Sequence, residues 1–102
     1  MKLEQVTFDV MQPLIGTSFW AEFPNGAKVE LRVTAVYKVM EGVPNTRLNR
    51  EPFSIHFIGP KSFLLKQGTY MMGHETFGEP MPMFLVPVGE DAQVYNYEAV
   101  FT

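Results

Sequence analysis

The side chains that could perform acid–base or metal chemistry are few in this sequence. His56 and His74 lie on separate predicted strands and lack the four-residue spacing that places two zinc-binding histidines on one helix face. The serines lie outside the Gly-x-Ser-x-Gly pattern of a nucleophile elbow. There is no cysteine, which excludes thiolate nucleophiles, thiolate metal ligands and disulfides. The sequence therefore argues against an enzyme, and it indicates no metal or other cofactor.

The two histidines and Glu98 are the groups left for general acid–base catalysis. His74 shares a strand face with Tyr70 and Met72, which favours a half-buried histidine with satisfied hydrogen bonds over a metal ligand. His56 lies on the polar face of its strand, where we expect a solvated ring with no carboxylate in register. An enzyme that uses His74 or Glu98 as a general base is therefore the weakest of three hypotheses.

Tryptophan and methionine provide the first candidate for a binding surface. Trp20 falls on the outer face of its predicted strand, where it could anchor a partner protein or pack beneath an N-terminal helix. Met71, Met81 and Met83 lie on two successive strands, and methionine serves adaptable interfaces as well as irregular cores. The leading hypothesis is a non-enzymatic module that binds another protein through these four residues, with core packing as the alternative for the methionines.

A second hypothesis is a barrel that binds a small ligand. Several tyrosines share inward faces of their predicted strands with a methionine and a histidine. Such side chains could line a cavity inside a barrel. The candidate lining residues are Tyr70, Met72, His74, Tyr95 and Tyr97.

These candidate residues are carried by strands, because period-two alternation dominates the sequence. Residues 28–39 alternate most clearly: Val29, Val33 and Tyr37 share one face, with Val36 as the only exception to the pattern. Twelve residues would span about 40 Å as a flat strand, so we expect a bend or bulge. The Pro24-Asn25-Gly26 turn joins this strand to another at residues 17–23.

Further strands are predicted at residues 53–58, 69–75, 81–88 and 95–101, with the longest loop at residues 40–50. Prolines at positions 80, 82 and 87 place the strand at residues 81–88 at a sheet edge, or allow it to pair only in part. Thr7 is suited to cap a short helix over about residues 7–14. The fold class is therefore mainly β: a small antiparallel barrel of about six strands after one short helix.

Length and charge limit the class of partner. The chain has 102 residues, one domain over residues 1–102, and a net charge of −3. Residues 28–66 hold seven of the eight basic side chains, whereas residues 67–102 hold five acidic residues and no lysine or arginine. The acidic net charge argues against binding to nucleic acid, whose phosphate backbone is negative. The position of Tyr37, on the face opposite to the basic side chains, argues against it as well. No segment resembles a signal peptide or membrane span, so we expect a cytoplasmic protein with no membrane partner.

The motifs of the chain resemble those of a family of small bacterial proteins of the DUF6916 type. The resemblance is carried by Phe8, Leu14-Ile15-Gly16, residues 51–60 (EPFSIHFIGP), residues 65–70 (LKQGTY), His74, residues 84–89 (FLVPVG) and residues 97–101 (YEAVF). Members look like companions of tail-collar and tail-fibre-like proteins of bacteriophage type. The resemblance implies a structural or assembly role, a tail-fibre-like partner and a place in a phage-like particle. We expect a monomer or a weak homodimer.

Overall fold

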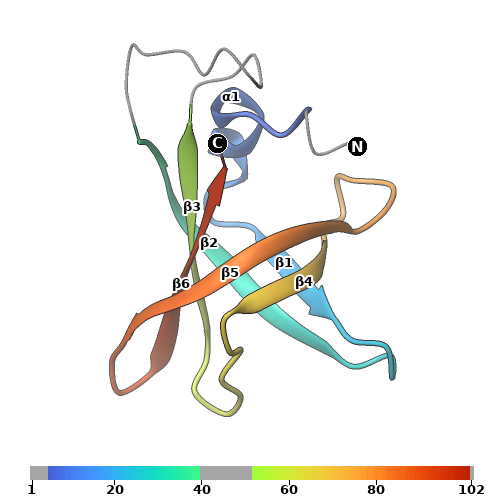
Figure 1. The fold of residues 1–102 in the computed structure, drawn as a ribbon, viewed down its shortest axis with the longest axis vertical. Coiled ribbons are helices and arrows are strands. Elements are labelled where there is room, and N and C mark those ends of the chain that lie inside the picture. Colours follow the sequence, from blue (N-terminus) through green and yellow to red (C-terminus); the bar gives the residue numbers. More distant parts are fainter. Residues whose placement is uncertain (1–4, 40–51, 102) are drawn as a thin grey trace.

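Six strands form a closed antiparallel barrel, and a short helix precedes them (Figure 1). The structure is a computed structural model that describes residues 5–39 and 52–101. The elements are α1 (Phe8–Met11), the 3-10 turn η2 (Gln12–Leu14), β1 (Ser18–Glu22), β2 (Lys28–Lys38), β3 (Phe53–Pro60), β4 (Gly68–Gly73), β5 (Met81–Glu90) and β6 (Val94–Phe101). The strand order around the barrel is β1-β2-β3-β6-β5-β4, closed by pairing of β4 with β1. The predicted fold class is therefore confirmed; the loop predicted at residues 40–50 lies outside the described residues.

The helix begins at the predicted capping residue. The Val10 N–H donates to the Thr7 hydroxyl over 3.3 Å, and Asp9 lies in the first turn, where it complements the helix dipole. Pro13 lies in the 3-10 turn, which tightens the end of the helix. Gly16 follows with a φ of +90°, a conformation that favours glycine. The helix lies at one end of the barrel, beside the start of β3 and the end of β6 (Figure 1).

A β-bulge in β2 changes which of its residues face the core. The pairing register with β3 shifts between Val33 and Ala35, as the predicted length of this strand suggested. One extra residue reverses the inward and outward positions beyond the bulge. Val36 is therefore buried with 8% exposure, while Tyr37 and Val39 are 56% and 53% exposed. The expectation that Tyr37 shares one face with Val33 was wrong, because strict alternation does not continue through the bulge.

Strand β5 is long and changes partner halfway along its length. It pairs with β4 over Met81–Leu85 and with β6 over Val86–Glu90. Each half of the strand therefore forms backbone hydrogen bonds along only one of its two edges. This arrangement tolerates Pro82 and Pro87, each of which lacks a backbone N–H. Of the two sequence-based alternatives, partial pairing is therefore the one that occurs, and β5 is not a free edge of the barrel.

The core fills the barrel with aromatic and aliphatic side chains. Tyr97 is fully buried, and its phenolic oxygen accepts a hydrogen bond from the Leu65 N–H at 3.0 Å. Gly59 brings the β3 backbone so close to Leu31 and Tyr97 that a Cβ atom would collide with the leucine side chain. The largest fully buried side chains include Phe19, Phe53, Phe57, Met11, Leu31, Ile55, Leu65, Met72 and Leu85. Among the described residues, no helix is long and apolar enough to cross a membrane.

Candidate functional site

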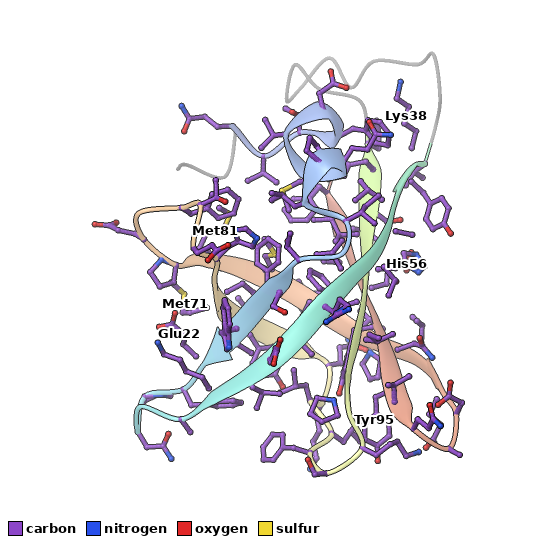
Figure 2. All side chains as sticks on the ribbon, turned by 180° about the vertical axis from the view of Figure 1, so that it is seen from behind. Glu22, Lys38, His56, Met71, Met81 and Tyr95 are labelled. Carbon is purple, nitrogen blue, oxygen red and sulfur yellow. The ribbon has the colours of Figure 1, made fainter. Side chains whose placement is uncertain are left out.

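An apolar strip crosses the outer face of the barrel over β1, β4 and β5. Strand pairing sets Glu22 across from Met71 (Figure 2) and Met71 across from Pro82, so these side chains form one outward row. Phe84 lies two residues farther along β5 on the same face. Met71 and Phe84 are 44% and 50% exposed, Pro82 is exposed, and Trp20 is half-buried. We call Trp20, Met71, Pro82 and Phe84 the apolar strip.

The strip contains two of the four residues predicted for an interaction surface. Met81 and Met83 are instead core residues with 2% exposure, and this part of the prediction was wrong. Side chains of β5 alternate between the two faces, and the inward set contains both methionines. Pro82 and Phe84 occupy the outward positions between and beyond them. The alternation was visible in the sequence, but the choice of inward face depends on how β5 pairs with β4.

A groove of about 240 Å³ adjoins the strip at Trp20. It lies between the outer face of β1 and the segment that links β4 to β5, residues 74–80. Gly73 lies across from Trp20, and a Cβ atom at Gly73 would collide with the Glu22 carboxylate. The groove is lined by Trp20, Glu22, Lys28, Gly73, His74, Glu75, Phe77, Gly78, Glu79 and Pro80.

Both ring nitrogens of His74 have hydrogen-bond partners. The Thr76 N–H donates to Nδ1 at 3.0 Å, so this nitrogen carries no proton. The Thr17 hydroxyl donates to the Leu14 carbonyl at 2.6 Å and therefore accepts from Nε2–H of His74 at 2.8 Å. The pattern requires a neutral ring protonated on Nε2. Its one basic lone pair is already used, which leaves no nitrogen to act as a general base.

The surroundings of His74 keep the ring neutral. It is 6% exposed and packs against Phe19 and Phe77, with ring centroids 4.6 and 5.3 Å away. Burial lowers the pKa of His74 below its ordinary value, and the nearby Glu75 carboxylate opposes this effect less strongly. His74 therefore anchors the segment after β4, which forms one wall of the groove.

His56 (Figure 2) forms an acid–base pair with Glu98 on another side of the barrel. The residues are directly paired between β3 and β6, with 3.1 Å between Nε2 and Oε2, and Tyr37 contacts the histidine ring edge-on. The expectation of no carboxylate in register with His56 was wrong. Strand β3 pairs with β6, which comes three strands later in the chain, and this pairing places Glu98 beside His56. Tyr37 also shares the outer face with basic residues of β2, so only the acidic net charge still argues against nucleic acid.

The five residues expected to line a ligand cavity do not share one open space. Met72 and Tyr97 are fully buried and pack in the core. Tyr70 is half-buried, and its hydroxyl donates to the Lys66 carbonyl at 2.6 Å. Tyr95 lies under the Lys61 ammonium, 4.5 Å from the ring centroid. His74 alone of the five contacts the groove described above.

Residues 6–101 match the family model described as "Domain of unknown function (DUF6916)". The chain belongs to this family. The match spans α1 and all six strands of the DUF6916 domain, including the apolar strip and the groove. No curated protein and no solved structure matches the chain.

A second hollow of the DUF6916 domain lies at the end of the barrel formed by the β1–β2 turn. It has a volume of about 420 Å³, and its walls include Phe23, Val29 and Phe63. The Phe23 ring lies 5.8 Å from Phe63 and 5.9 Å from Tyr70 between centroids. Sequence reasoning missed this site because Phe63 lies in a connection without periodicity. Among the described residues, no group of three or more histidine, aspartate or glutamate side chains is placed to hold a metal ion.

Proposed function

We propose that this DUF6916 domain is a non-enzymatic module that binds another protein through the apolar strip. The observation that carries the proposal is the cluster of Met71, Pro82 and Phe84 on adjacent strands, all three exposed. Contiguous apolar surface on a small domain commonly marks a site of association. Trp20 extends the strip onto β1, and tryptophan and methionine are both enriched in the centres of protein interfaces.

The strand framework supports docking without a large change of shape. Met71 and Pro82 face each other across a backbone ladder within a closed barrel, so their positions are set before a partner arrives. A preorganised surface loses little conformational entropy on binding. The finer proposal is a tail-fibre-like partner of bacteriophage type, in an assembled particle or in the cytoplasm, and it is supported by the resemblance of the family motifs.

The test is co-expression with the product of the neighbouring gene, followed by affinity capture. We expect Phe84→Ser and Met71→Ser to reduce capture of a stoichiometric partner by at least about tenfold, as loss of a buried anchor does. The matched control is Val100→Ser, which removes an equally exposed apolar side chain from β6. Equal capture by all four proteins would refute the role of the strip, and no stoichiometric partner for the unmodified chain would refute the function.

The 420 Å³ hollow favours a second candidate function, the binding of a small apolar ligand at the barrel mouth. Its volume and aromatic walls fall within the range of ligand sites. The test is titration with 1-anilinonaphthalene-8-sulfonate, a fluorescent dye with apolar aromatic rings and one sulfonate group. Saturable binding at one site that is lost in Phe63→Ala and kept in Phe84→Ser would support this candidate. Binding unaffected by Phe63→Ala would remove it.

A further inference from the structure

The geometry points to an arginine-bearing extended segment as the part of the partner that docks on this face. The segment would lay apolar side chains on the apolar strip and insert one arginine side chain into the groove beside Trp20. This inference rests on the proposed protein-binding function and specifies the chemistry of the partner. It is carried by three features of the groove: its charge, its aromatic wall and its continuity with the strip.

The groove is acidic. Its lining residues include the carboxylates of Glu22, Glu75 and Glu79 against one cation, Lys28. Within the part of the chain that the structure describes, none of these three carboxylates forms an ion pair. The imbalance agrees with the absence of lysine and arginine from residues 67–102. A cationic side chain is therefore the complementary occupant.

The aromatic wall favours arginine over lysine. Trp20 and Phe77 both line the groove, and a guanidinium group stacks on aromatic faces while donating hydrogen bonds within its plane. A carboxylate at the rim can accept two parallel hydrogen bonds from one guanidinium group. The ammonium group of lysine cannot form this paired arrangement. The groove volume of about 240 Å³ accommodates the end of one long side chain.

The groove and the strip form one continuous surface. Trp20 belongs to both, and Glu22 at the groove rim is paired with Met71 of the strip. In an extended segment, alternate side chains point to the same face about 7 Å apart. One arginine followed at alternate positions by apolar residues therefore matches the order of features on this face.

Fluorescence provides a direct test, because Trp20 is the only tryptophan of the chain. The probes are acetyl-Phe-Gly-Arg-Gly-Phe-amide and the same peptide with uncharged citrulline in place of arginine. We expect a saturable change in Trp20 emission, with about tenfold or greater preference for the arginine peptide, the range of a charge-assisted hydrogen bond. The preference should shrink as the salt concentration rises.

Charge-neutralising variants locate the binding. The triple variant Glu22→Gln, Glu75→Gln, Glu79→Gln should lose the preference for arginine, whereas Glu90→Gln, an acid on β5 outside the groove lining, should keep it. Equal affinity for the two peptides, no saturable change at millimolar concentration, or a preference that survives the triple variant would each overturn the inference. If capture of the partner fails in Phe84→Ser but persists in the triple variant, the proposed function stands and the arginine inference falls.

Discussion

At the scale of single residues, His74 illustrates how a group with catalytic potential becomes structural. Its Nδ1 accepts from the Thr76 backbone and its Nε2–H donates to Thr17, so the ring links the segment after β4 to the residue before β1. The strand pattern predicted a satisfied histidine on this face. The strand pattern could not identify Thr17 as the hydrogen-bond partner, because that contact joins residues 57 positions apart.

The burial of His74 predicts a dependence of stability on pH. Because its pKa is lowered in the folded state, the unfolded chain binds the proton more readily below the ordinary pKa of about 6.5. The stabilisation is therefore present above that pH and is lost as the pH falls toward the folded-state pKa. The free energy of unfolding, measured with urea, should fall less between pH 7.5 and pH 5.5 in His74→Gln than in the unmodified protein. Ring ¹⁵N shifts showing His74 protonated at pH 6.5 would contradict this account.

At the scale of elements, the sequence predicts the type and order of the strands well. Alternation located all six strands, and Thr7 and Gly16 marked the short helix between them correctly. The inward face of each strand was predicted less reliably. Tyr37 lies beyond a bulge, and Met81 and Met83 lie on a strand whose outer residues are also apolar, so both faces of these segments look alike in sequence. Register, which pairs His56 with Glu98, depends on contacts that a single sequence does not record.

The close packing of β3 in the barrel predicts the effect of a single methyl group. In Gly59→Ala, the new Cβ would lie 2.5 Å from the Leu31 side chain and 3.1 Å from the Tyr97 ring. Overpacking of this kind costs about 1–3 kcal/mol, which urea unfolding would measure. Gly78→Ala is the matched control, because no atom lies within 4 Å of the added Cβ. Equal stability of the two variants would show that the core near Gly59 relaxes freely.

At the scale of the whole molecule, closure of the barrel restricts how it can associate. Each described strand pairs with two others, so none of them is a fully free edge that a partner strand could join along its whole length. This arrangement favours association through side chains of the outer surface, where the apolar strip and the acidic groove adjoin. The residue types of the strip were partly predictable, since Trp20 and Met71 were candidates from the sequence. The groove was not predictable from the sequence, because it forms only when the segment after β4 lies beside β1.

The most direct measurement of the central claim is site-specific photo-crosslinking in the native cell. A benzophenone amino acid placed at position 84, in the strip, should form a crosslink to one specific protein. The same group at position 100 should not, although Phe84 and Val100 are equally exposed. Equal crosslinking from both positions, or from neither, would contradict the account of the apolar strip as the docking face.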